Sequence, residues 1–144
     1  MKREVFAMSL LFISTVRAGE AKEPQRTIAC KTPAIARSCY WTQGRLLMTN
    51  GNPSYRLWKI GTNRILGIYS GPVTFNGRFT DQYALDNEGP QLPPNVESSL
   101  WKSVTGPWPN EVFADFEVCP LEKEKPEEMQ AACIESAKNI VIKK

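Results

Sequence analysis

Apolar and polar residues alternate over three short stretches in the middle of the chain, which is typical of half-buried β-strands. The pattern predicts strands over residues 44–49, 55–60 and 65–69. Turn sequences rich in Gly and Asn separate them, and an Asn-Gly pair at 50–51 provides the positive φ angles that tight hairpins use. The three strands therefore predict an antiparallel meander.

The alternation also predicts which side chains of the second strand lie outside. If Tyr55 and Leu57 point into a core, then Arg56 and Trp58 lie outside as a neighbouring charge and ring. The second strand thus offers a candidate contact surface.

A short helix and further strands follow the meander. Val96, Leu100 and Val104 recur every four residues, which predicts a helix over 95–104 with Asn95 as its N-cap. Alternation predicts a strand over 111–119, and a short strand over 79–85 is expected within a loop. Apolar runs predict strands over 129–135 and 140–142, although residues 130–137 could equally form a helical turn.

The element order is a three-strand meander, one helix, and two or three strands. This mainly β order is typical of a small Greek-key barrel of the OB type, whose helix falls between the third and fourth strands. A small β-sandwich is the alternative fold. We expect disulfides to stabilise the domain in either fold.

The first residues have the features of a signal peptide, namely two basic residues, a short apolar run and small residues at a cleavage site. We predict a signal peptide over 1–18, with cleavage after Ala18 or Ala21, an N-terminal arm over 19–38 and a single β-rich domain over 39–144. No transmembrane segment is expected in the mature protein, because the apolar run is too short to cross a bilayer. The predicted destination is periplasmic or extracellular.

Four cysteines, Cys30, Cys39, Cys119 and Cys133, lie in the exported part, and an even number predicts two disulfides. Three pairings are possible. The spacing favours Cys30 with Cys39 and Cys119 with Cys133, because each pair would close a short loop.

The chain has no histidine, which excludes catalytic triads and sites with His-ligated metals. Ser99 and Lys102 have the S-x-x-K spacing of some serine enzymes, but the companion motifs are absent. Turn chemistry explains the oxygen-rich stretch 86–88 without calcium. We therefore predict no catalytic residues, no metal, no cofactor and no enzymatic activity.

Charge is divided unevenly along the chain. Residues 40–80 contain five basic residues and no acid, whereas residues 81–128 contain eleven acids and three lysines. The net charge of the whole chain is +3, but without residues 1–18 it falls to +1. Aromatic residues lie among the basic ones, and this combination can bind a flexible anionic chain. The candidate ligand-binding residues are Arg45, Arg56, Trp58, Arg64 and Tyr69.

The predicted function is a non-catalytic binding or structural module. Its candidate partners are an anionic glycan, a lipid head group at a membrane surface, or an acidic protein surface, and nucleic acid is not expected for an exported protein. An inhibitor of a secreted enzyme and a His-free enzyme are the alternatives. The basic meander could instead form ion pairs with the acidic part of its own domain, which would leave no site.

Overall fold

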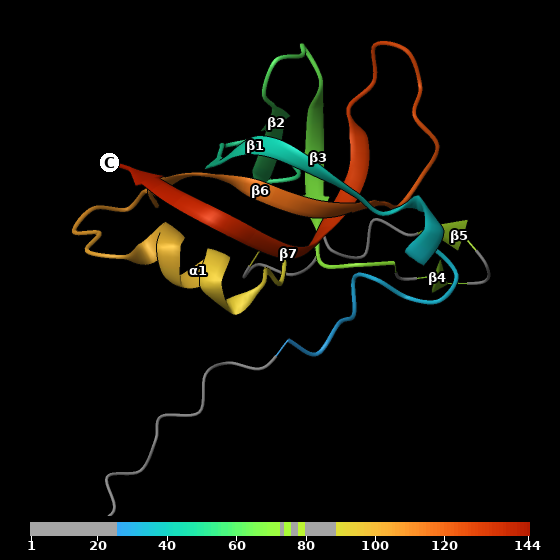
Figure 1. Ribbon diagram of the computed structural model, residues 1–144, viewed down its shortest axis with the longest axis horizontal. Helices are drawn as coiled ribbons and strands as arrows, with labels where there is room; N and C mark the ends of the chain where they lie inside the picture. Colours follow the sequence, from blue (N-terminus) through green and yellow to red (C-terminus); the bar gives the residue numbers. More distant parts are fainter. Residues whose placement is uncertain (1–25, 73, 76–77, 80–88) are drawn as a thin grey trace, which may run out of the picture.

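The computed structural model describes residues 26–72, 74–75, 78–79 and 89–144 (Figure 1). The predicted signal peptide, most of the predicted strand 79–85 and the oxygen-rich stretch 86–88 lie outside the described residues.

Five strands close into a barrel in the order β1-β2-β3-β7-β6, with β1 also pairing β6. The pair β3–β7 is parallel and the other pairs are antiparallel. This confirms the predicted OB-type barrel and makes the alternative sandwich wrong. The barrel strands are β1 (Tyr40–Met48), β2 (Tyr55–Lys59), β3 (Ile65–Tyr69), β6 (Glu111–Pro120) and β7 (Gln130–Lys143); β4 (Thr74–Phe75) and β5 (Arg78–Phe79) form a separate two-stranded ribbon.

Inward-pointing side chains of all five barrel strands form the core. The alternation predicted for the second strand is confirmed, because Tyr55 and Leu57 are buried while Trp58 is exposed and Arg56 is half-buried. The largest fully buried side chains of the barrel strands are Phe116, Leu46, Leu57, Ile68 and Ile134.

Helix α1 (Pro94–Trp101) covers one end of the barrel, and its Val96 and Leu100 are buried in the same core (Figure 1). The predicted cap was wrong: Pro93 occupies the N-cap position, and Asn95 donates instead to the carbonyl of Ala137 at 2.9 Å.

The helix also ends earlier than predicted. Ser103 adopts a φ of 57°, a left-handed conformation that does not continue a helix. The backbone N–H of Asn110 donates to the last-turn carbonyl of Leu100 at 2.7 Å. Val104 is therefore in the following loop and not on the helix.

Strand β7 runs without interruption where two strands were predicted. A register shift against β6 between Phe113 and Asp115 accommodates the polar stretch of β7, and Asn139 adopts a φ of 55° there. The amide of Asn139 donates to Asp115 at 2.7 Å. A bulge can absorb such polar residues without ending the strand.

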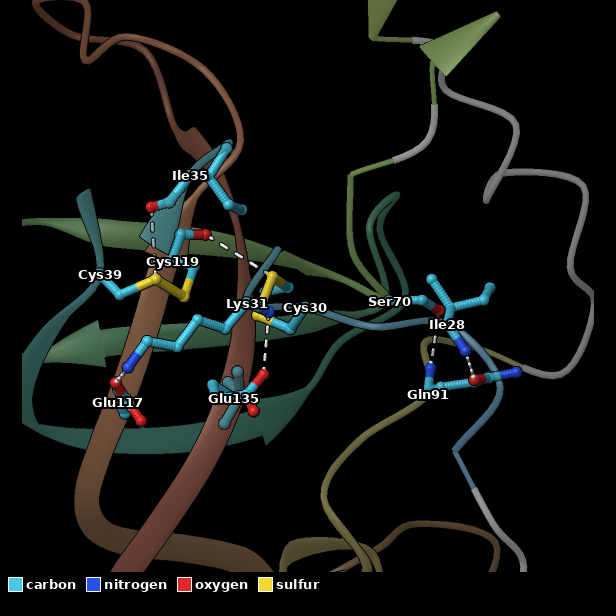
Figure 2. The surroundings of a disulfide bond; sticks show 12 residues. Ile28, Cys30, Lys31, Ile35, Cys39, Ser70, Gln91, Glu117, Cys119 and Glu135 are labelled. Carbon is cyan, nitrogen blue, oxygen red and sulfur yellow. Dashed lines mark hydrogen bonds and ion pairs between the residues drawn. A yellow bond between two sulfur atoms is a disulfide. The ribbon is translucent and has the colours of Figure 1, made fainter. Parts of the chain in front are cut away.

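The predicted disulfide pairing was wrong. Cys30 is bonded to Cys133 and Cys39 to Cys119, across sequence separations of 103 and 80 residues (Figure 2). Cys119 and Cys133 are register partners on β6 and β7, and each is bonded to a cysteine that precedes β1. Loop-closure entropy favours near neighbours only in a chain without structure, whereas here the fold sets which sulfurs meet.

Residues 26–38 of the predicted arm lie against the barrel and include the 3-10 helix η1 (Ala36–Ser38). The guanidinium of Arg26 donates to the carbonyls of Ser70 at 2.6 Å and Ile134 at 2.7 Å. Lys31 forms an ion pair with Glu117 at 2.5 Å, and its backbone N–H donates to Glu135 (Figure 2). The described part of the arm, residues 26–38, therefore packs against the barrel.

Candidate binding face

The outer surface of the barrel carries one continuous row of residues that crosses all five strands. Each member is the register partner of the next, and we call this set the outward row: Ile65, Trp58, Arg45, Phe113 and Val141. The register partners Ile65 and Trp58 are 44% and 38% exposed, and Val141, beyond Arg45 and Phe113 in the row, is 62% exposed.

The turn between β2 and β3 fixes the indole of Trp58. Its Nε1 donates to the carbonyl of Thr62 at 2.6 Å. The hydroxyl of Thr62 donates to the carbonyl of Lys59 at 2.8 Å and accepts from the backbone N–H of Arg64 at 3.0 Å. The ring is thus held in one orientation while much of it faces solvent.

Arg45, the centre of the outward row, forms a two-point ion pair with Glu111. Its Nε donates to Oε2 at 3.0 Å and its Nη2 to Oε1 at 2.5 Å. This hydrogen bonding raises the pKa of Arg45 and lowers the pKa of Glu111, which the charge of Lys143 lowers further. The pair orients Arg45 and leaves its Nη1 without an acceptor among the described residues.

Arg56 lies beside the outward row and has no acidic partner among the described residues. It is the register partner of Leu47 on β1 and of Gly67 on β3. Its guanidinium lies against Gly51 in the β1–β2 turn, and its Nε is buried without a hydrogen-bond partner. An unpaired buried donor of a cation is costly, and because this Nε is buried, only the terminal nitrogens of Arg56 could donate to an anion from outside.

Two of the predicted ligand residues are placed elsewhere. Arg64 forms an ion pair with Glu124 in the loop between β6 and β7, beside a pocket of about 340 Å³. Tyr69 is half-buried opposite Cys133, four residues beyond Ile65 and roughly 13 Å along β3. The structure therefore brings Arg45, Arg56 and Trp58 together, keeps the backbone of Arg64 in the turn beside Trp58 while its side chain pairs with Glu124, and separates Tyr69 from them.

The charge segregation of the sequence is partly explained by these contacts. Arg45 and Arg64 from the basic meander pair with Glu111 and Glu124 from the acidic half. Ion pairs within the domain thus account for two of the basic residues, in line with the alternative that the meander pairs with the acidic part of its own domain.

An open pocket of about 470 Å³ adjoins Arg45. It is formed by the loop after α1 and the end of β7, which lie beside each other in Figure 1, and its walls include Trp108, Asn110, Glu111 and Lys143. Sequence reasoning missed this pocket. Trp108 between two prolines was a usable signal, because an aromatic residue in a breaker-rich loop has no evident place in the core.

The other chemical candidates have structural roles. The hydroxyl of Ser99 donates to the carbonyl of Asn95 at 2.6 Å within α1. The sulfurs of Cys30, Cys119 and Cys133 lie within 4.8 Å of one another, but all three belong to disulfides and offer no thiolate to a metal.

Comparisons with protein-family models, with curated proteins and with solved structures found no match. Within the described ranges, none of the helices has the length and apolar character needed to cross a membrane. Two disulfides are typical of proteins from oxidising compartments.

Proposed function

We propose that this protein is an exported, non-catalytic binding module that holds an anionic glycan chain on the outward row. The observation that carries the proposal is the juxtaposition of Trp58 and Arg45. A fixed, exposed indole lies beside a cation whose orientation is already set, so a ligand would meet both groups with little loss of side-chain entropy.

Sugar rings and indoles pack face to face through apolar C–H groups, and guanidinium groups bind carboxylate or sulfate. Arg45 retains Nη1 for such a group, and Arg56 beside it lacks an acid among the described residues. The row therefore supplies both of the contacts that an acidic sugar needs.

The shape of the face favours a chain over a small molecule. The outward row crosses the strands on the outside of a closed barrel, so a ligand chain can extend from one strand to the next along it. OB-type barrels commonly bind oligomers across the outer face of strands 2 and 3, which supports the proposal by analogy of fold alone.

Export is proposed on the sequence of residues 1–18 together with the two disulfides. Fusion of residues 1–25 to a reporter enzyme that is active only outside the cytoplasm tests it. An inactive reporter would contradict export.

The binding test measures the affinity of the mature protein for a panel of acidic polysaccharides at low and high salt. We expect Trp58→Ala to weaken binding by about 1–2 kcal/mol, roughly 5- to 30-fold, and added salt to weaken the wild type. Trp41→Ala is the matched control, because Trp41 is also exposed on β1 but its ring packs against Lys138 away from the row. Equal losses in both variants, or binding that ignores salt, would contradict the proposed face.

A further inference from the structure

We infer that the pocket beside Trp108 is a second subsite of the same binding face, which takes an acidic group further along the glycan chain. The inference rests on the proposed function, because it extends the ligand that Trp58 and Arg45 would hold. The carboxylate of a uronic acid and the sulfate of a sulfated sugar are the two chemical forms that this subsite would recognise.

Arg45 joins the two subsites. It is the register partner of Trp58 on one side, and on the other it lines the pocket together with Trp108 and Lys143. A ligand that lies across Trp58 and passes over Arg45 therefore reaches the pocket without leaving the protein surface.

Trp108 is an exposed aromatic side chain on a loop whose backbone is restricted. It is 52% exposed and stands between Pro107 and Pro109, whose rings restrict the backbone on both sides. Asn110, two residues after Trp108, anchors this loop to the helix end, because its amide donates to the carbonyls of Ser99 at 3.1 Å and Lys102 at 2.9 Å. Exposing so large an apolar ring on an anchored loop contributes nothing to the core, and a stacking role explains the arrangement.

The charges around the pocket favour an anion. Glu111 is the acid of the pocket wall, and both of its oxygens accept from Arg45. Lys143, the register partner of Glu111, lowers the pKa of that carboxyl but forms no ion pair of its own among the described residues. The Lys143 ammonium thus remains for a ligand.

The spacing sets the length of the ligand. Along the route that passes over Arg45, β1 and β6 lie between β2, which carries Trp58, and β7, which carries Lys143, and these three strand intervals amount to roughly 14 Å around the barrel. This span is longer than one sugar ring, so only an oligosaccharide can occupy both subsites at once.

The test measures binding of short and long acidic oligosaccharides by calorimetry at low salt. Oligogalacturonides supply carboxylates and heparin-derived oligosaccharides supply sulfates, each as a disaccharide and an octasaccharide. We expect the octasaccharide of the recognised form to bind the wild type more tightly, and Trp108→Ala and Lys143→Gln each to weaken that binding about tenfold while leaving disaccharide affinity unchanged.

Trp101→Ala is the matched control, because Trp101 is 42% exposed on α1 and does not line the pocket. Thermal unfolding of every variant checks that the fold is retained. If Trp108→Ala and Lys143→Gln bind the octasaccharide as tightly as the wild type while Trp58→Ala has lost it, the subsite is wrong and the proposed function stands. If the wild type binds neither oligosaccharide series, the proposed function and the subsite are both overturned.

Discussion

The two disulfides form a nested pair, and this geometry predicts how much each contributes to stability. Cys39–Cys119 lies within the loop that Cys30–Cys133 closes. When one bond is present, the other closes only the small loop formed by two short segments, from Cys30 to Cys39 and from Cys119 to Cys133. This loop contains roughly 25 residues in all. The chain-entropy relation then gives about 3.5 kcal/mol for removing either bond alone.

Removing both bonds should cost more than twice that amount. The second bond to be removed closes a loop of 80 or 103 residues, for which the same relation gives about 4.5–4.7 kcal/mol. The combined loss is therefore about 8 kcal/mol. That is comparable with the whole stability of an ordinary domain. We expect the variant with all four cysteines replaced by Ala to be largely unfolded at room temperature.

The assay is urea unfolding of the wild type, of Cys30→Ala/Cys133→Ala, of Cys39→Ala/Cys119→Ala and of the fourfold variant. The slope of the free energy of unfolding against urea concentration must be compared too, because a disulfide also changes how far the unfolded chain expands. A non-reduced peptide map checks the pairing itself. A loss below about 1 kcal/mol in either paired variant, or a map that joins Cys30 to Cys39, would refute the reasoning.

Two further predictions concern the core at the helix-covered end of the barrel. Leu100→Ala should lower the free energy of unfolding by about 2–4 kcal/mol, because Leu100 is fully buried. Ser99→Ala should lower it by under about 0.5 kcal/mol. Similar denaturant midpoints for the two variants would contradict the packing of α1 against the barrel. Burial, aided by the charge of Glu97, raises the pKa of Tyr55 to about 12, so its contribution to stability is complete well below pH 10, the pKa of the unfolded tyrosine, and is lost as the pH rises toward 12. The loss is on the order of 3 kcal/mol and is measured as the difference in pH dependence of the free energy of unfolding between wild type and Tyr55→Phe; identical pH dependence would contradict it.

Local patterns predicted most of the strands because alternation reports directly on which side chains are buried. The third strand was predicted with the bounds that β3 has, and the inward placement of Tyr55 and Leu57 followed from their spacing alone. These features depend on neighbours along the chain. The closed barrel followed from element order, since few topologies accommodate a meander, a helix and two more strands.

Features that depend on distant parts of the chain were predicted less well. The disulfide partners of Cys30 and Cys39 lie on strands that are distant in sequence, so a preference for short loops gave the wrong pairing. The early end of α1 depends on Asn110, a residue beyond the helix that bonds its last turn. No local pattern contains either fact.

The candidate site shows the same division between local and distant information. Sequence alone placed Arg56 and Trp58 outside as a neighbouring charge and ring and gave Arg45 as a further candidate, but the outward row also needs Phe113 and Val141, which the pairing of β6 with β1 and β7 supplies. Alternation does place Phe113 on the outer face of its strand. Which strand lies next to it, and therefore which residues form one surface, is fixed only by the register.

The internal ion pairs do not argue against a binding face on this barrel. Exposed surface ion pairs usually contribute little to stability, because the charges are already solvated and two long side chains are ordered to form them. The pair between Arg45 and Glu111 nevertheless holds the guanidinium in one direction beside Trp58 and leaves Nη1 for another acceptor. Its main consequence is therefore the orientation of a cation, and an oriented cation next to a fixed indole is what recognition of an acidic sugar requires.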